Sequence, residues 1–239
     1  MSIKNNLRNG IYYNEKQYEG DEQMIKAMIF DLDGTIGNTL PLCIKAFRQT
    51  IEMFMKRSIS DEEIIATFGP SEEGTIYSLI PQQYDEGLEK YLHYYKLFHN
   101  ECPKAFEGIV EIIQDLKQKG IRIAMVTGKG KKSTDITLEQ YEIGDLFEQV
   151  ETGSITGSVK LAGMSAVLKN FEIKPEEAYY VGDAPTDITA ARQAGVRMIS
   201  AAWAKTAEIE KLKNLKPDYI FSTIPEFAEF CKTIPRISE

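Results

Sequence analysis

The sequence predicts an α/β protein in which a parallel sheet, flanked by helices, carries an inserted α-helical subdomain. Short apolar segments alternate along the chain with segments of helical period, which is typical of β-α-β units and of a parallel sheet covered on both faces. Residues 41–103 interrupt this alternation with helical patterns alone. The 239 residues suffice for one domain of ordinary size and a subdomain. We therefore expect a Rossmann-like core with a helical insertion between its first two strands.

The first predicted strand covers residues 24–30, an apolar run that ends at an acidic turn. Four later runs are rich in β-branched, aromatic and other apolar residues, as expected for strands that are buried on both faces of a sheet. These runs are residues 121–126, 178–181, 196–200 and 218–221. Together the five segments predict the parallel sheet.

The predicted helices lie between these strands and have recognisable ends. Gly120 and Gly195 each stand just past a helical segment, where glycine commonly ends a helix. Pro225 stands at a first helical position, which its fixed φ angle suits. The expected helices are residues 110–119, 133–141, 162–171, 186–194 and 225–232. Strand–helix–strand connections of this kind are right-handed, so the helices should cover the sheet.

The insertion is predicted to be helical because its apolar side chains recur at helical spacing and because breakers such as Gly69-Pro70 separate the segments. His93 and His99 lack metal-ligand spacing on a helix, so we expect them to be surface or packing residues. The side chains expected to fill the insertion's own core are Tyr91, Tyr94, Tyr95 and Phe98.

Three parts of the chain follow from these patterns. We assign residues 25–40 and 104–239 to the α/β core and residues 41–103 to a helical cap. Residues 1–24 are polar and show no sustained period, so we interpret them as an N-terminal extension outside the core.

Charge and cysteine content limit the classes of partner. The net charge of −8 repels phosphate backbones and anionic lipids, so we expect neither nucleic acid nor a membrane as a partner. Cys43, Cys102 and Cys231 are odd in number and far apart, which indicates reduced thiols. No secretory signal or long apolar stretch is present in the sequence. We therefore expect a cytoplasmic protein, monomeric or homodimeric.

Acidic and hydroxyl side chains follow three of the predicted strands. Asp31 and Asp33 follow the first strand, Thr127 the second, and Asp183 and Asp187 the strand that begins at residue 178. In open α/β sheets ligands bind at the carboxyl ends of the strands, so these groups should share one site. Clustered carboxylates stay ionised only with a cation among them, and an all-oxygen ligand set suits Mg²⁺. The sequence therefore predicts a magnesium site.

The first acidic motif also suggests covalent chemistry. A carboxylate beside a metal can act as a nucleophile, as in aspartyl-phosphate formation. A second carboxylate two residues on can serve as the general acid for the leaving alcohol and then as the general base for water. Gly34 gives the turn after Asp33 its backbone freedom, and exposed N–H groups there could receive phosphate oxygens.

In this order, the motifs of the chain resemble the haloacid dehalogenase-like (HAD) superfamily. These motifs are Asp31-x-Asp33-Gly34-Thr35, Thr127-Gly128, Lys160 and Gly182-Asp183-x-x-x-Asp187. More narrowly, the chain looks like the phosphoglycolate phosphatase and β-phosphoglucomutase branch, whose members carry a helical cap between the first two motifs. The resemblance covers residues 25 to about 232, and it implies a HAD-like core.

The resemblance implies a role for each matching residue. Asp31 would attack phosphorus, and Asp33 would protonate the leaving oxygen and then activate water. Asp183 would bind Mg²⁺ together with Asp31 and the Asp33 carbonyl group, while Asp187 would act directly or through water. The groups implied to hold the phosphoryl oxygens are Gly34, Thr35, Thr127, Gly128 and Lys160. An Asp at position 33 argues against a dehalogenase, because the dehalogenases of the family lack that acid.

Two departures from the family pattern leave questions open. The lysine motif reads Lys160-Leu161-Ala162-Gly163, without the prolines that many relatives have, so Lys129 competes with Lys160 for its role. Asn38-Thr39 stands where relatives usually have Asp-Ser or Asp-Thr, so one acid near the cap hinge is missing. The loop Phe68-Gly69-Pro70-Ser71-Glu72 stands where relatives contact substrate, and Trp203 could border the site or pack in the core.

The combined reading is a Mg²⁺-dependent phosphatase that acts on a small soluble phosphomonoester through a phospho-Asp31 intermediate. A β-phosphoglucomutase-like phosphotransferase is an alternative, although such relatives carry a cap histidine where this chain has Leu42-Cys43-Ile44. A non-catalytic binding module is a second alternative, and the intact aspartates argue against it. The ester itself stays open among phosphoglycolate, a sugar phosphate, a nucleotide and pyrophosphate.

Overall fold

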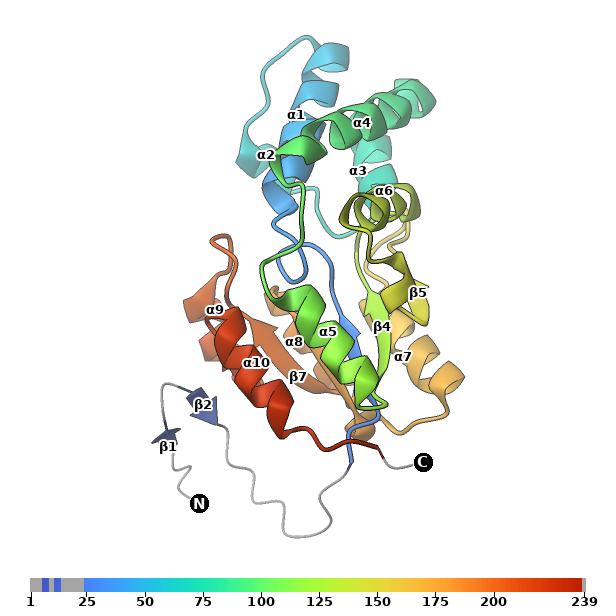
Figure 1. Ribbon diagram of the computed structural model, residues 1–239. Coiled ribbons are helices and arrows are strands. Elements are labelled where there is room, and N and C mark those ends of the chain that lie inside the picture. The colour runs from blue at the N-terminus through green and yellow to red at the C-terminus, as the bar shows by residue number, and fades with distance from the viewer. Residues whose placement is uncertain (1–5, 9–10, 14–23, 238–239) are drawn as a thin grey trace.

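The computed structural model describes residues 6–8, 11–13 and 24–237. Its main sheet has six parallel strands in the order β5-β4-β3-β6-β7-β8 (Figure 1). Because β3 lies between β4 and β6, the residues that follow it stand at the centre of the sheet edge. The strands are β3 (Ala27–Phe30), β4 (Arg122–Val126), β5 (Gln149–Glu151), β6 (Ala178–Gly182), β7 (Arg197–Ala201) and β8 (Tyr219–Phe221).

Helices cover both faces of this sheet, as the apolar strands predicted. In β3, Met28 and Phe30 point to one face and Ala27 and Ile29 to the other, because strand side chains alternate. The first face packs against α5 (Ile109–Gln118), α6 (Lys131–Tyr141) and α10 (Ile224–Thr233). The second packs against α7 (Lys160–Phe171), α8 (Pro185–Ala194) and α9 (Ile209–Leu215).

Two elements of the core were not predicted. Strand β5 is an edge strand of three residues with the sequence Gln-Val-Glu, which has no apolar run to mark it. Helix α9 is seven residues long and buries one side chain fully, Leu212. The first strand was also predicted too long, since β3 begins at Ala27 and Met24 is exposed. The short 3₁₀ turns of the core are η3 (Gly144–Leu146) and η4 (Pro175–Glu177).

The segment between β3 and β4 folds into helices with a core of their own. We call α1 to α4 the helical insertion; Figure 1 shows it beyond the ends of β3 and β4 that lead into α1 and α6. Its core contains the fully buried Phe47, Tyr91 and Tyr95. The helices are α1 (Leu40–Met55), α2 (Asp61–Ile65), α3 (Glu72–Leu79) and α4 (Tyr84–Phe98), with 3₁₀ turns η1 (Pro81–Gln83) and η2 (His99–Glu101).

The two histidines occupy packing and surface positions, as expected. His99 is fully buried, with Nε2 3.0 Å from the Thr137 hydroxyl and Nδ1 3.0 Å from the Cys102 carbonyl oxygen. His93 is exposed on α4.

Most of the predicted N-terminal extension, residues 1–24, lies outside the described residues. Within it the structure describes two antiparallel strands, β1 (Asn6–Arg8) and β2 (Ile11–Tyr13). Among the helices that the structure describes, none combines the length and the apolar character needed to cross a membrane.

Candidate active site

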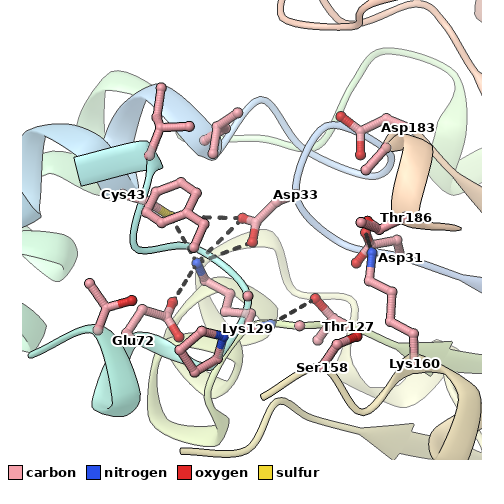
Figure 2. A pocket seen from close by; sticks show the side chains of 18 of the residues that line it. Asp31, Asp33, Cys43, Glu72, Thr127, Lys129, Ser158, Lys160, Asp183 and Thr186 are labelled. Carbon is pink, nitrogen blue, oxygen red and sulfur yellow. Dashed lines mark hydrogen bonds and ion pairs between the residues drawn. The ribbon is translucent and has the colours of Figure 1, made fainter. Parts of the chain in front are cut away.

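A cavity of about 380 Å³ lies at the carboxyl edge of the sheet, where the core meets the helical insertion. Figure 2 shows side chains that line it from both sides. Its lining includes six of the nine residues predicted to be catalytic, phosphate-binding or metal-binding, namely Asp31, Asp33, Thr127, Gly128, Lys160 and Asp183. The parallel strands therefore bring these distant motifs to one place, as predicted.

Asp31 stands at the middle of this edge because it directly follows the central strand. Its backbone N–H donates to the Val181 carbonyl oxygen at 2.8 Å, which extends the pairing between β3 and β6 by one residue. Its side chain is almost fully buried, and Oδ1 accepts a hydrogen bond of 2.7 Å from the Leu32 backbone N–H. The carboxylate is thus held in one orientation.

Lys160, and not its competitor Lys129, contacts Asp31. It is the first residue of α7, and its Nζ lies 2.6 Å from Asp31 Oδ2 and also donates to Asp187 Oδ1. Burial alone would lower the pKa of Lys160, but the carboxylates of Asp187 and Asp31 outweigh burial and hold the pKa well above its usual range. Lys160 is therefore a permanent cation beside Asp31.

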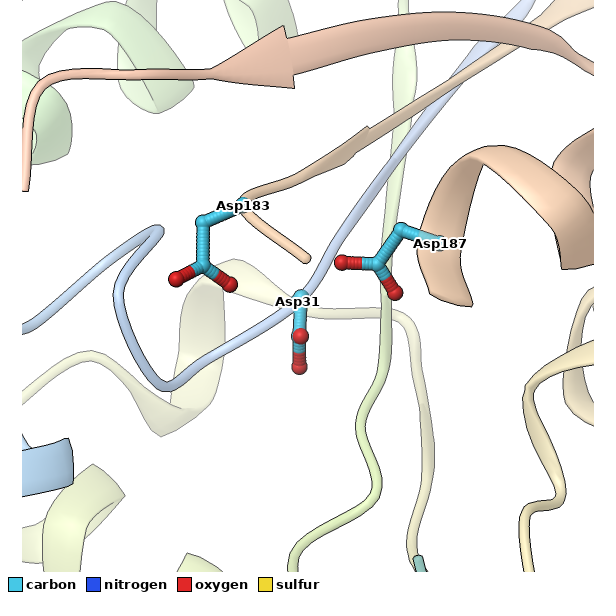
Figure 3. A group of neighbouring side chains, drawn as sticks. All are labelled: Asp31, Asp183 and Asp187. Atoms are coloured by element: carbon cyan, nitrogen blue, oxygen red, sulfur yellow. The ribbon is translucent and has the colours of Figure 1, made fainter. Parts of the chain in front are cut away.

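Asp31, Asp183 and Asp187 form a cluster in which one oxygen from each lies within 4.8 Å of the others (Figure 3). Burial raises the pKa of Asp31 to about 6 and that of Asp183 well above its usual range, and the neighbouring carboxylates add to both shifts. Three carboxylates face one ammonium group here, so the cluster lacks positive charge. Oxygen donors in this number suit Mg²⁺, and the residues present fit that ion.

Gly34 permits the close approach of Asp183. It adopts φ +73°, and a Cβ atom at this position would overlap the Asp183 carboxylate. Gly34 and Thr35 do not line the cavity, however, and the Thr35 side chain is fully buried. These two residues form the turn that lets Asp33 and Asp183 reach the site, and their contact with phosphate stays a prediction.

Asp187 is fully buried at the beginning of α8. Oδ2 accepts a hydrogen bond of 2.9 Å from the Ala184 backbone N–H, and Oδ1 accepts from Lys160 and from the Tyr180 hydroxyl. These contacts make Asp187 the partner that orients Lys160, a connection that the sequence did not indicate.

The Asp33 side chain points away from the carboxylate cluster (Figure 2). Its two oxygens lie 3.3 and 3.4 Å from Lys129 Nζ, and Oδ1 also accepts a hydrogen bond from the Thr39 hydroxyl. The predicted contribution of Asp33 to a metal site is thus restricted to its backbone carbonyl group. Its carboxylate faces the other half of the cavity.

Lys129 connects the core to the helical insertion. Its side chain is fully buried, with Nζ 3.0 Å from Glu72 Oε1 and 3.0 Å from Cys43 Sγ, in addition to Asp33. Burial would lower the pKa of Lys129, but Asp33, Cys43 and Glu72 outweigh it and keep the pKa well above its usual range. Burial raises the pKa of the Cys43 thiol to about 12, so Cys43 stays protonated.

Glu72 was not predicted as an individual site residue. It begins α3, accepts a 2.7 Å hydrogen bond from the Ser133 hydroxyl, and accepts from the Gly130 backbone N–H. The only signal for it in the sequence was its place in the loop 68–72, of which Phe68, Gly69 and Pro70 also line the cavity. This loop therefore does reach the site.

Thr127 and Gly128 lie in the loop that follows β4. The Thr127 backbone N–H donates to the Glu151 carbonyl oxygen at 3.0 Å, and its hydroxyl oxygen accepts from the Lys129 backbone N–H at 3.2 Å.

Trp203, which the sequence placed either at the border of the site or in the core, has a packing role. Its ring stacks on Phe227 with the ring centroids 5.4 Å apart, and its Nε1 donates to the Thr35 carbonyl oxygen.

We expect Lys160→Met to destabilise the protein in the absence of added metal. Removing the ammonium group leaves Asp31 and Asp187 buried without a cation, which costs about 3 kcal/mol of unfolding free energy. Urea denaturation at neutral pH measures the loss, and Lys160→Arg, which keeps the charge, is the matched control. An unfolding free energy equal to that of the unaltered protein would contradict the assignment of this buried ion pair.

The sequence pattern of haloacid dehalogenase-like hydrolases matches residues 28–201, more than half of the chain. A relative from Caldanaerobacter subterraneus subsp. tengcongensis, named "Putative pyrophosphatase PpaX", is 34% identical over 211 residues, which cover 87% of this chain and 95% of the relative.

Solved structures agree with this match. A haloacid dehalogenase-like family hydrolase from Streptococcus pneumoniae superposes with a TM-score of 0.70 at 25% identity, covering 86% of this chain and 98% of the other. A protein from Haemophilus somnus named "predicted phosphoglycolate phosphatase" has the same fold, with a TM-score of 0.68 at 24% identity and coverage of 89% and 99%. The chain belongs to the haloacid dehalogenase-like hydrolase family.

Proposed function

We propose that the protein is a Mg²⁺-dependent phosphatase that hydrolyses a small phosphomonoester through a phosphorylated Asp31. One observation carries the proposal. A buried Asp31 carboxylate stands between Lys160 and Asp183, while the carboxylate of Asp33, two residues on, faces the opposite half of the same cavity. This arrangement separates a nucleophile from an acid and base, as two-step phosphoryl transfer requires.

Asp31, Asp183 and the Asp33 carbonyl group are the groups that would hold Mg²⁺, with Asp187 behind them. When bound, Mg²⁺ supplies positive charge that neutralises the carboxylates and the phosphoryl group.

Asp31 and Asp33 carry out the two steps of the reaction, which are phosphoryl transfer to the enzyme and hydrolysis of the phosphorylated aspartate. A carboxylate oxygen of Asp31 bonds to phosphorus, the bond from phosphorus to the leaving oxygen breaks, and Asp33 gives that oxygen its proton. In the second step Asp33 takes a proton from water, whose oxygen attacks phosphorus and releases inorganic phosphate and Asp31. Lys160 and the Thr127–Gly128 loop lie where they can hold phosphoryl oxygens.

The helical insertion is proposed to act as a cap over the cavity. Glu72 from α3 contacts Lys129, Gly130 and Ser133, which all belong to the segment after β4 that also contains Thr127. These contacts hold the insertion against the core, so that bulk water is kept from the reacting groups.

Hydrolysis is favoured over a mutase reaction because no histidine lines the cavity among the described residues. Positions 42–44 hold Leu42, Cys43 and Ile44, and Cys43 contacts Lys129. Incubation with a hexose phosphate tests the alternative, since a mutase would give isomerisation without free phosphate.

The proposed function is tested by measuring phosphate release from a panel of phosphorylated metabolites in the presence of Mg²⁺. Release that depends on Mg²⁺ supports it. Release that continues unchanged in the presence of EDTA contradicts it.

Mg²⁺ binding should strengthen as the pH rises. The raised pKa of Asp31, about 6, means that this carboxyl group holds a proton at pH 5 and has lost it at pH 7, and the pKa of Asp183 is also raised. A metal must displace such a proton, so one group with this pKa gives about tenfold tighter binding at pH 7 than at pH 5.

Calorimetric titration of the protein with Mg²⁺ at the two pH values measures this effect. Asp31→Asn is the matched control, because it removes one of the two groups with a raised pKa and should weaken the dependence. Equal dissociation constants at both pH values would contradict the prediction.

A further inference from the structure

The cavity has a phosphoryl half at Asp31 and a leaving-group half at Asp33, and the two differ in charge and polarity. What this implies about the substrate rests on the proposed roles of Asp31 and Asp33. The phosphoryl group must lie at Asp31, and the leaving oxygen must reach Asp33, which gives it a proton. Asp33 faces Lys129 and Cys43 and not the carboxylate cluster (Figure 2). The organic part of the substrate therefore occupies the half of the cavity between Asp33 and the helical insertion.

The wall of this half is apolar. The helical insertion contributes to it the side chains of Leu40, Cys43, Phe47, Ile65, Phe68 and Pro70. The Phe47 and Phe68 rings are 5.9 Å apart, which places both at one part of the wall. Phe68 is 37% exposed and Ile65 47% exposed, so apolar surface there remains in contact with water and is available to a ligand.

The charges of this half are not suited to an anion. Among the described residues that line the cavity, the cations are Lys160 and Lys129. Lys160 belongs to the phosphoryl half, where it pairs with Asp31 and Asp187. Lys129 already pairs with two carboxylates, those of Asp33 and Glu72.

With Asp33 ionised, the leaving-group half holds one ammonium group and two carboxylates, a net charge of −1. With Asp33 protonated, as the first step requires, the charges of Lys129 and Glu72 cancel, and no cation is left to pair with a second anion. Two other basic residues of the insertion do not line the cavity and pair with acids elsewhere: Lys45 with Glu101 and Arg48 with Asp61. A second anionic group on the substrate would be desolvated here without a free cation, which is unfavourable.

We propose that the site selects phosphomonoesters whose leaving alcohol is uncharged and apolar, and that it discriminates against substrates whose leaving group is itself an anion. The cavity of about 380 Å³ has room for such an alcohol beside the phosphoryl group. Phosphoglycolate and pyrophosphate, which carry a carboxylate or a second phosphate beyond the scissile bond, are poor substrates by this account.

Propyl phosphate and phosphoglycolate form a comparable pair, because an uncharged ethyl group in one stands in the place of the carboxylate of the other. We expect kcat/KM for propyl phosphate to exceed that for phosphoglycolate by at least about tenfold at fixed ionic strength. The value for benzyl phosphate should be higher than both, and the value for pyrophosphate should be lower than that for propyl phosphate. A higher kcat/KM for phosphoglycolate or pyrophosphate overturns the inference and leaves the proposed function intact. Absence of phosphate release from every ester, p-nitrophenyl phosphate included, overturns the proposed function and the inference with it.

A cation placed on the apolar wall should shift this preference. Phe68→Arg introduces one at a partly exposed position outside the catalytic groups, so folding should be retained. We expect it to raise kcat/KM for phosphoglycolate relative to propyl phosphate by about tenfold, mainly through KM, because the new charge pairs with the carboxylate. Phe68→Leu is the control and should keep the original order, and Ile65→Arg repeats the test at a second exposed position. An unchanged ratio in both arginine variants would show that the wall does not contact the leaving group.

Discussion

Asp31→Asn is expected to lower kcat by at least about 10⁴-fold, because the amide has the shape of the carboxylate but is not a nucleophile toward phosphorus. The side chain is almost fully buried and bonded to Lys160 and to the Leu32 backbone N–H, so the amide should occupy the same position. Steady-state phosphate release measures the loss.

Asp135→Asn provides the control for this variant. Asp135 is exposed on α6 and pairs with Lys131 at the surface, so its substitution should leave kcat unchanged. Substantial turnover by Asp31→Asn, with the circular dichroism of the folded protein, would contradict covalent catalysis at Asp31.

Removal of Mg²⁺ is expected to reduce activity by at least about 10³-fold and to be reversed when the metal is restored. Without the metal, the buried Asp31 and the half-buried Asp183 have raised pKa values, and an incoming phosphate dianion meets a cluster of three acids and one ammonium group. Charge neutralisation is the main contribution to catalysis of phosphoryl transfer, so its loss has a large effect.

Asp183→Asn distinguishes a loss of activity that is due to weaker metal binding from one that is due to disruption of the fold. It removes one oxygen ligand and one charge, and we expect a Mg²⁺ concentration for half-maximal activity at least about tenfold higher than that of the unaltered protein. An activity that neither EDTA nor Asp183→Asn diminishes would show that the carboxylate cluster serves no metal.

The sequence was most informative where the chain is buried on both faces. Apolar runs in the sequence predicted five of the strands, which are β3, β4, β6, β7 and β8. The parallel arrangement of these strands places Asp31, Thr127 and Asp183 at one edge of the sheet. Strand β5 and helix α9 were not predicted because both are short. The three residues of β5 are half-buried, and α9 buries one side chain fully. Their existence depends on tertiary contacts and not on local pattern.

The site shows the same division between local and long-range information. Lys160 was expected to neutralise Asp31, and the structure places it there at 2.6 Å. The Thr35 side chain is fully buried, which its place in the acidic motif did not indicate. The pairing of Lys129 with Glu72 joins residues 57 positions apart on different parts of the fold, and no periodicity or motif in the sequence connects them.

The most direct test of the account is to find the phosphoryl group on the enzyme. Acid quenching during turnover preserves an acyl phosphate, borohydride reduction then marks the aspartate that carried it, and mass spectrometry of the peptides locates the mark. We predict a mark at Asp31 in the unaltered protein with Mg²⁺ and substrate, and none when Mg²⁺ is omitted. A mark at another residue, or full turnover with no mark at all, would contradict the central claim that Asp31 is the nucleophile.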